Sequence, residues 1–290
     1  MNKLVGISID QYNNPLIKTL NNCLTDLQSI IASLTAKFKF DEIDLLAKAE
    51  QTTKSSVYNA LYELLINSLE EDNILILFAG HGEYNPVIGS SYWLLYDSQR
   101  KDITTWFNLN DLLQLFKFAP AKHIALISDS CFSGGIFENT RGGGFQAFEG
   151  KKSRYALTSG SIEKVKDGLP NTASPFAMTL VNLINSYDGE KLTFTELCEK
   201  TIIAFSEKMT QTPNYGALNN CGHEGGVFVL QPIEQNVRFQ DLKLSVEISR
   251  QINIDYDFKI PFLKKDRSYD SEFINSFIAQ KGYWIINEVR

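Results

Sequence analysis

The chain has 290 residues, of which 43% are hydrophobic, 12% aromatic and 21% charged. This composition is typical of a globular protein and excludes disordered, collagenous and coiled-coil classes. The net charge is −6, and no lysine or arginine cluster is long enough to follow a phosphate backbone, so we expect no nucleic-acid partner. The apolar runs are too short to cross a bilayer, and no cleavage site follows the first ten residues. We therefore expect a cytoplasmic protein with no membrane partner.

Short apolar strands alternate with amphipathic helices along most of the chain. The β-branched run at 4–9 predicts a first strand, and leucines and isoleucines spaced by three or four predict a helix over 16–38. Further strands are expected at 43–47, 73–79, 92–96, 123–128, 155–159 and 226–230, and further helices at 53–69, 175–187 and 193–209. This βαβ alternation predicts an α/β fold with about six strands in a mostly parallel sheet and helices on both faces.

The pattern changes after Pro232. Residues 233–290 alternate polar and apolar positions and hold nine basic and nine acidic side chains, so the net charge of −6 belongs to the first part. We predict a domain at 1–232 and a small C-terminal extension at 233–290. The extension could be a regulatory module, or it could pack on the domain and cover the edge strand at 226–230, in which case a monomer is expected.

Two segments place a reactive side chain where a buried strand runs into a glycine turn. They are ILFAGHGE at 76–83, with His81, and LISDSCFSGG at 126–135, with Cys131. Because the carboxyl ends of parallel strands line one crevice, this arrangement would bring imidazole and thiol together. A thiolate attacks a carbonyl carbon, and a nearby imidazole can protonate the leaving amine. The backbone amides of Gly82 and Cys131 are the candidate oxyanion donors.

Each residue alone has a structural explanation, since a lone cysteine is usually core and a lone histidine beside glycine is usually a turn residue. Together, a strand ending in AGHG and, about fifty residues later, a strand ending in DSCFSGG resemble the caspase-like cysteine peptidases of family C14. The metacaspase and orthocaspase branch is the most similar. The resemblance covers residues 1–232, including CGHEGGVFVL at 221–230, and implies a caspase-like sandwich that hydrolyses peptide bonds.

Substrate preference follows from the same resemblance. Asp129 stands where metacaspase-like enzymes carry an acidic residue that pairs with arginine or lysine, whereas true caspases carry glutamine. Cys23 and Asp26, in LNNCLTD, correspond to a cysteine and an aspartate that line the same pocket in metacaspases. On the helical pattern alone Asp26 could equally be a solvated residue. Ala79 replaces a serine found in many metacaspases, which leaves arginine, lysine or a non-basic preference open.

Some relatives require calcium, which binds several hard oxygen ligands. Asp111 and Glu138 lie near positions where those relatives carry acidic ligands, but the neighbouring Asn110 is neutral and no DxDxD array exists. We expect no required cofactor, with calcium as the alternative. Four cysteines without a CxxC pair suggest neither a disulfide framework nor a zinc site.

The glycine-rich stretch after Cys131 is expected to be a loop. It includes RGGG at 141–144 and KKSR at 151–154, so a basic-specific peptidase could cleave itself there, with a solvated linker as the alternative. The candidate positions are Arg141, Lys151, Lys152 and Arg154.

The remaining histidines and Cys198 are weaker candidates. We expect His123 on the surface, His223 outside the catalytic site and Cys198 in the core of a helix. The expected partners are a protein or peptide substrate and an activating partner, and relatives suggest a role in bacterial stress, cell death or defence. A caspase-fold pseudoenzyme that acts as a scaffold, or another hydrolase or acyltransferase with the same two residues, are the alternatives.

Overall fold

The computed structural model describes residues 1–131, 150–160, 172–189, 191–206 and 212–233. Of Cys131 and Ser206 it describes the backbone only. Contacts within the chain divide it into two units, Met1–Ile233 and Glu234–Arg290. The second unit lies outside the described residues, so the boundary at 232 and the role of the extension stay predictions.

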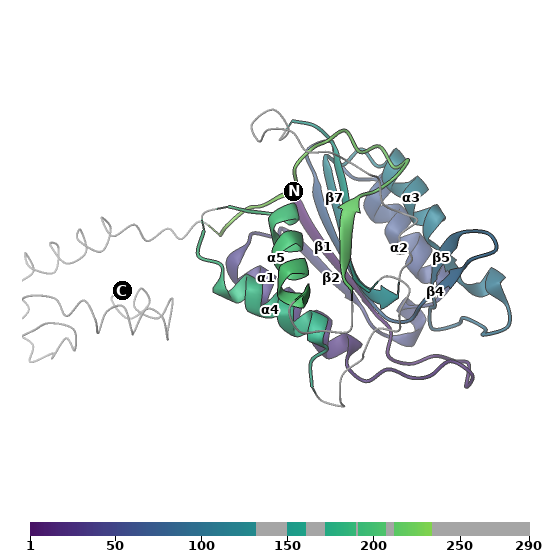
Figure 1. Ribbon diagram of the computed structural model, residues 1–290. Coiled ribbons are helices and arrows are strands. Elements are labelled where there is room, and N and C mark those ends of the chain that lie inside the picture. The colour runs from purple at the N-terminus through teal and green to yellow at the C-terminus, as the bar shows by residue number, and fades with distance from the viewer. Residues whose placement is uncertain (132–149, 161–171, 190, 207–211, 234–290) are drawn as a thin grey trace, which may run out of the picture. The chain divides into compact units, whose positions relative to one another are not determined.

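Six strands form the main sheet in the order β10-β8-β7-β3-β1-β2 (Figure 1). The five from β8 to β2 are parallel, and β10 is antiparallel to β8. The fold class predicted from the sequence is therefore confirmed. The strands are β1 (Asn2–Ser8), β2 (Glu42–Leu46), β3 (Asn73–Ala79), β7 (His123–Cys131), β8 (Ser153–Gly160) and β10 (Asn214–Ala217).

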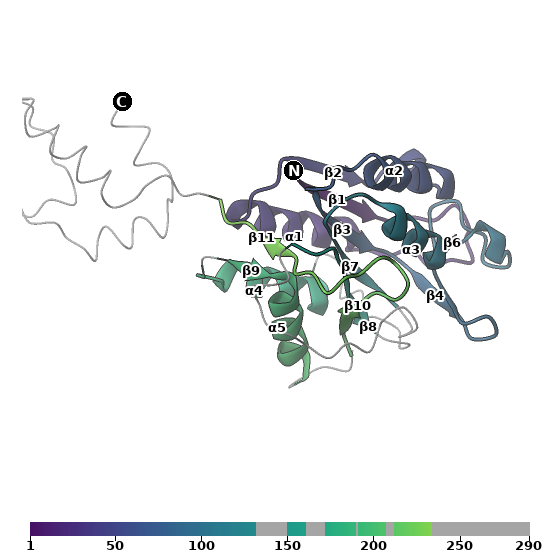
Figure 2. The same ribbon diagram turned by 90° about the horizontal axis from the view of Figure 1, so that it is seen from above.

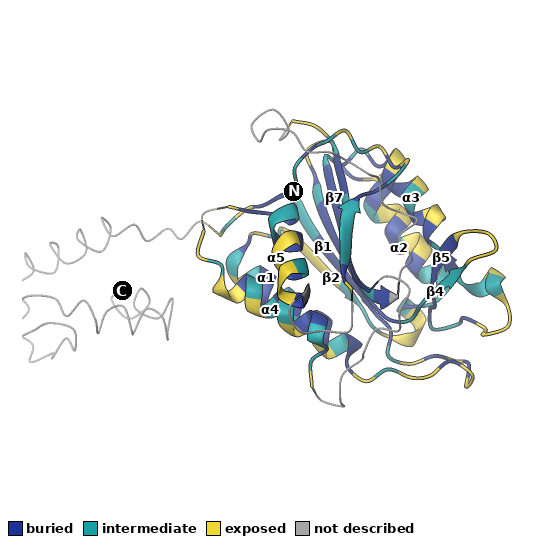
Figure 3. Ribbon diagram, viewed as in Figure 1, coloured by how far each residue is buried: buried dark blue, intermediate teal, exposed yellow. Residues whose placement is uncertain are grey.

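Helices cover both faces of this sheet (Figure 2). One face carries α1 (Cys23–Lys37), α4 (Pro175–Ser186) and α5 (Phe194–Ser206), and the other carries α2 (Lys54–Ile66) and α3 (Leu109–Phe118). Strand side chains alternate between the two cores: Phe78 lies in the α2/α3 core, while Leu77 and Ala79 lie in the α1/α4/α5 core. The strands are mostly buried and the outer helix faces are exposed (Figure 3).

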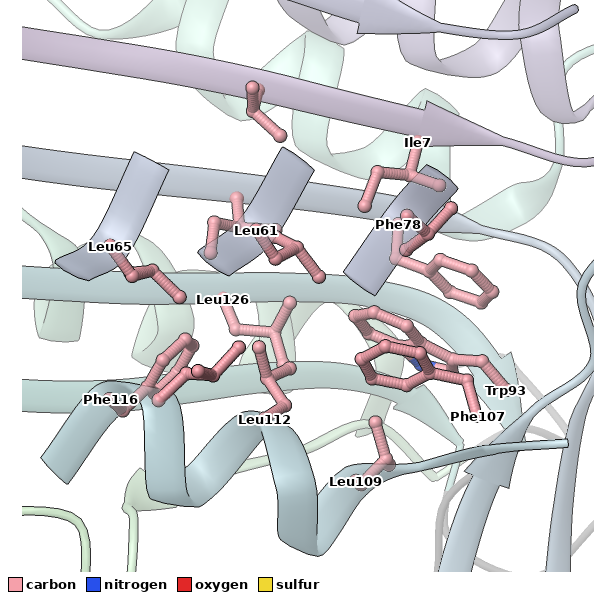
Figure 4. Packing of buried hydrophobic residues seen from close by; sticks show 14 of the residues in the cluster. Ile7, Leu61, Leu65, Phe78, Trp93, Phe107, Leu109, Leu112, Phe116 and Leu126 are labelled. Carbon is pink, nitrogen blue, oxygen red and sulfur yellow. The ribbon is translucent and has the colours of Figure 1, made fainter. Parts of the chain in front are cut away.

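Smaller elements complete the first unit. A three-stranded antiparallel sheet consists of β4 (Gly82–Asn85), β5 (Ser90–Trp93) and β6 (Phe107–Asn108). Trp93 stacks on Phe78 at 4.0 Å and on Phe107 at 5.5 Å between ring centroids, which fixes this small sheet on the end of β3 (Figure 4). A two-stranded ladder joins β9 (Leu192–Thr193) to β11 (Val229–Leu230), and two 3-10 turns are η1 (Ala49–Gln51) and η2 (Ile103–Thr105).

Two predicted strands do not belong to the main sheet. The strand expected at 92–96 is β5, which belongs to the small sheet because Trp93 stacks on Phe78. The strand expected at 226–230 pairs only with β9, and β10, which the sequence did not predict, forms the edge of the main sheet instead. The argument for a covered edge at 226–230 therefore loses its basis, and the monomer stays a prediction.

The helix expected over 16–38 begins at Cys23 rather than at Leu16, whose side chain is 62% exposed. The carboxylate of Asp10 sets this start, since it accepts from the amides of Cys23 at 2.9 Å and Leu24 at 3.1 Å. By contrast, α2 begins where expected, because Thr53 accepts from the Ser56 amide. Within the described residues, no helix has the length and apolarity needed to cross a membrane.

Candidate active site

The register of the two central strands fixes the site. Ala79 of β3 is paired with Asp129 of β7, and the Gly80 amide donates to the Asp129 carbonyl at 3.4 Å. His81 and Cys131 each follow this pair by two residues. Because the strands are parallel and neighbouring strands lie about 4.8 Å apart, the backbones of both residues emerge at the same edge of the sheet.

The end of β7 is irregular. Ser128 pairs with Thr158 and Cys131 with Gly160, so two residues of β7 stand opposite one residue of β8. This is a β-bulge, a feature that bends a strand and is frequent next to active sites. The Ser128 and Ser130 hydroxyls lie 2.8 Å apart within it. The backbone position of Cys131 is therefore set by a bulge, after which the pairing resumes between Cys131 and Gly160.

His81 is held at three points. Its Nε2 lies 2.7 Å from the carbonyl oxygen of Lys18, and since a carbonyl only accepts, Nε2 carries a proton. In the neutral ring Nδ1 is then the basic nitrogen. The His81 amide donates to the hydroxyl of Tyr12 at 2.9 Å, and its carbonyl accepts from the Leu94 amide at 2.9 Å.

The segment between β1 and α1 supplies these supports, and sequence reasoning missed all of them. Tyr12 is buried, its hydroxyl donates to the Ile9 carbonyl at 3.3 Å, and its ring lies 5.2 Å from the imidazole of His81. The same segment contributes the Lys18 carbonyl and the Asp10 cap of α1. It therefore connects His81 to the helix that carries Cys23 and Asp26.

The structure brings the predicted acidic pair to one residue, Ser174. The Ser174 amide donates to both carboxylate oxygens of Asp26, at 3.2 and 3.1 Å, and its hydroxyl donates to Oδ2 of Asp129 at 2.9 Å. Asp26 is only 3% exposed, which excludes the alternative of a solvated helix residue, while Asp129 is half-buried. Cys23 is buried on the same stripe of α1, one turn before Asp26.

Residues 3–140 match the family model described as the metacaspase, peptidase C14 domain. This segment belongs to the caspase-like C14 peptidases. The C14 segment contains His81, Cys131, Cys23 and both aspartates, whereas Ser174 lies beyond it. Ala79 of the C14 segment is buried in the α1/α4/α5 core and is the register partner of Asp129.

Two further comparisons concern the whole chain. No curated protein matches it. A crystal structure of protein GSU0716 from Geobacter sulfurreducens is similar, with a TM-score of 0.55 and 14% identity over 78% of this chain and 99% of that one. At this identity the likeness shows a shared fold alone.

Among the predicted self-cleavage positions, Arg154 does not lie in the expected loop. Arg154 lies inside β8 with 0% of its surface exposed, and its guanidinium donates to five backbone carbonyls, those of Phe116, Ala119, Ala121, Lys122 and Ser153. Burial lowers the pKa of this guanidinium to about 10, so it remains a cation at neutral pH.

Lys151 is exposed and Lys152 half-buried, and Arg141 lies outside the described residues. The Lys152 carbonyl accepts from the amides of Glu224 and Gly226, at 3.0 and 3.1 Å, and its amide donates to the Glu224 carboxylate at 3.2 Å. Cleavage after Lys152 therefore requires these bonds to break.

The two other histidines and Cys198 each have defined surroundings in the structure. His123 is buried, not on the surface as predicted, and its Nδ1 lies 2.8 Å from the Ser153 hydroxyl, which satisfies that nitrogen in the interior. His223 accepts from the Arg154 amide through Nδ1 at 3.0 Å. Cys198 is fully buried in α5, as predicted, and burial raises the pKa of its thiol.

The remaining predictions about the site stay untested. Gly82 is the first residue of β4, paired with Trp93, and its role as an oxyanion donor is a prediction. Asp111 is exposed in the first turn of α3, and Glu138 lies outside the described residues. Across the described ranges, no group of three or more histidine, cysteine or acidic residues is arranged to hold a metal ion.

Proposed function

We propose that this C14 peptidase is a cysteine endopeptidase in which Cys131 is the nucleophile and His81 the general acid and base. The observation that carries the proposal is the register of β3 and β7, in which His81 and Cys131 each follow the Ala79 and Asp129 pair by two residues. Parallel neighbouring strands give both residues the same edge. The Lys18 carbonyl supports the role of His81, since it holds Nε2–H and leaves Nδ1 as the base.

The proposed reaction has two steps. Nδ1 of His81 takes the thiol proton, and the Cys131 sulfur forms a bond to the peptide carbonyl carbon. The C–N bond then breaks, and the amine leaves with the proton from His81, which gives a thioester. His81 next takes a proton from water as the hydroxide adds to the thioester carbon. The C–S bond then breaks, the Cys131 sulfur takes the proton back from His81, and the carboxylic acid product leaves. Amides of Gly82 and Cys131 would stabilise the oxyanion of both steps.

The proposed substrate has arginine or lysine before the scissile bond. Asp129 and Asp26 supply two carboxylates on the side of the sheet that α1 and α4 cover, and both accept hydrogen bonds from Ser174. A basic side chain would form charge-assisted hydrogen bonds with Asp129, the more exposed of the two. The carboxylate of Asp26, which is hydrogen-bonded to the same Ser174, would add to the negative field.

We also propose that the peptidase needs no cofactor, acts on a protein or peptide substrate after an activating partner binds, and functions in the cytoplasm as a monomer. Self-cleavage after Arg141, Lys151 or Lys152 belongs to the same proposal, as does a role in bacterial stress, cell death or defence. Calcium, through Asp111 and Glu138, is the alternative that a chelator would test.

The test is hydrolysis of fluorogenic peptides ending in Arg, Lys, Asp or Leu, with calcium or with chelator. Wild type is compared with Cys131→Ala and with Cys198→Ala, a matched loss of a buried thiol in α5. We expect cleavage after Arg or Lys that Cys131→Ala abolishes and Cys198→Ala retains. Cleavage after Leu would retain the mechanism and contradict the specificity. A wild type that cleaves no peptide, with or without a candidate activator, would favour the scaffold alternative.

A further inference from the structure

Ser174 is the residue at which α1, β7 and α4 meet. It lies 148 residues from Asp26 and 45 residues from Asp129 in the chain, yet it hydrogen-bonds to both carboxylates. It is 2% exposed and is the N-cap of α4. We propose that Ser174 is a positioning residue that fixes the two carboxylates for a basic side chain. This inference rests on the proposed basic specificity and adds the residue that sets it.

The direction of each hydrogen bond at the Ser174 hydroxyl is determined. The Ala177 amide donates to the hydroxyl oxygen at 3.1 Å. A serine hydroxyl has a single proton, and a carboxylate only accepts, so the proton points to Oδ2 of Asp129 at 2.9 Å. The Ala177 amide, the Ser174 hydroxyl and the Asp129 carboxylate thus form a chain of donors that starts in the first turn of α4. This chain selects one orientation for the Asp129 side chain.

The backbone amide of Ser174 fixes the orientation of the Asp26 carboxylate. Asp26 is only 3% exposed, so its carboxylate needs hydrogen-bond donors from the protein in place of water. The Ser174 amide is such a donor, and it is shared between the two carboxylate oxygens. Pro175 at the first position of α4 fixes the backbone of this turn. Because both carboxylates face the amino end of α4, the helix dipole also offsets the repulsion between the two negative charges.

A residue that only caps α4 would behave differently. Loss of a cap lowers the stability of the helix and affects all substrates alike, whereas loss of a positioning hydroxyl weakens the binding of a cation selectively. Thr53 offers the matched control, since its hydroxyl caps α2 on the opposite face of the sheet by accepting from the Ser56 amide at 3.2 Å.

The experiment is the binding of benzamidine, an arginine-like cation, to the Cys131→Ala protein by calorimetry. Ser174→Ala should weaken binding by about tenfold or more, since the hydrogen bond goes to a charged group. Ser174→Gly should do the same with a smaller loss of helix stability, which keeps the test valid if the alanine variant unfolds. Ser174→Thr should restore binding, and Thr53→Ala should leave it unchanged.

Two results would overturn the inference. One is equal benzamidine affinity of the Cys131→Ala protein with and without Ser174→Gly, and the other is no benzamidine binding by either of them. The assay needs no turnover, so its outcome is independent of whether the peptidase activity is found. In an active protein, Ser174→Gly should lower the ratio of kcat/KM for arginyl over leucyl peptides by about tenfold, whereas Thr53→Ala should not alter this ratio.

Discussion

Ala79 and Asp129 are register partners in the two central strands, and their pairing sets what lies beyond them. The ladder of β3 and β7 ends at this pair, and His81 and Cys131 follow it by two residues at the same edge of the sheet. A slip of one residue would also turn the Asp129 side chain to the α2/α3 face, away from Asp26. The stacking of Trp93 on Phe78, one residue before Ala79, holds the end of β3 against such a slip.

Tyr12→Phe tests the support of His81. The change keeps the ring beside the imidazole but removes the hydroxyl that accepts from the His81 amide at 2.9 Å. We expect kcat to fall about tenfold with KM nearly unchanged, because a displaced base affects the transition state more than substrate binding. Steady-state kinetics on the preferred peptide measures both constants. Tyr58→Phe, at an exposed tyrosine of α2, is the control, and an equal loss in both variants would contradict a positioning role for Tyr12.

Local signals in the sequence were sufficient for several elements. The uniform apolar run of β3 predicted a buried strand with the observed bounds, and Thr53 and Pro175 marked the starts of α2 and α4. The two segments that carry His81 and Cys131 could be recognised from the sequence because strand ends and glycine turns are local features. Their placement on neighbouring strands required the resemblance or the βαβ pattern as well.

The supports of the site were not readable, because they depend on contacts between distant residues. The Asp10 carboxylate caps a helix that starts 13 residues later, and Ser174 contacts Asp26 across 148 residues. The short β10 has no distinctive alternation, so only its pairing with β8 defines it. The sequence predicted that Arg154 lies in a loop, because it follows two lysines closely. Its burial depends instead on distant residues, the carbonyls at the end of α3 that accept from its guanidinium.

Thiol labelling tests Cys131 without a substrate. The other three cysteines, Cys23, Cys198 and Cys221, are at most 6% exposed, and burial raises the pKa of the Cys198 thiol. A thiolate is the reactive form, so iodoacetamide should add a single group to the native protein, and Cys131→Ala should remove it. His81→Ala should slow this labelling about tenfold at pH 7 if His81 takes the thiol proton. Mass spectrometry counts the adducts, and a second adduct at a rate equal to the first would contradict the assignment.

Asp72 predicts a pH dependence of stability. Burial raises the pKa of this carboxyl, but hydrogen bonds from the Leu69 amide, the Met1 amino group and Lys3 outweigh it, so the pKa is lowered on balance. A folded pKa below the unfolded value of about 3.9 gives stability that is present above that pH and is lost as the pH falls through the folded pKa. Asp72→Asn should therefore lower the free energy of unfolding by about 1–3 kcal/mol at pH 7 and by less at pH 3.

Urea unfolding at pH 7, 5 and 3 measures this difference. Asp44→Asn, at an exposed position of β2, is the matched control and should change the free energy of unfolding little at any of these values. If the difference between wild type and Asp72→Asn were the same at pH 3 as at pH 7, the ionised carboxylate would not be its source.

Arg154→Met tests whether this buried cation holds the domain together. The methionine fills a similar volume but removes the guanidinium donors from five carbonyl oxygens, including those of Phe116 and Ala119 at the end of α3. We expect a loss of about 3–5 kcal/mol in the free energy of unfolding, which urea denaturation would measure. Arg154→Lys keeps the charge but has fewer donors, so its loss should be smaller. Lys101→Met, at an exposed turn, should cost about 0.5 kcal/mol or less. A loss for Arg154→Met as small as that of Lys101→Met would show that water replaces the guanidinium without penalty.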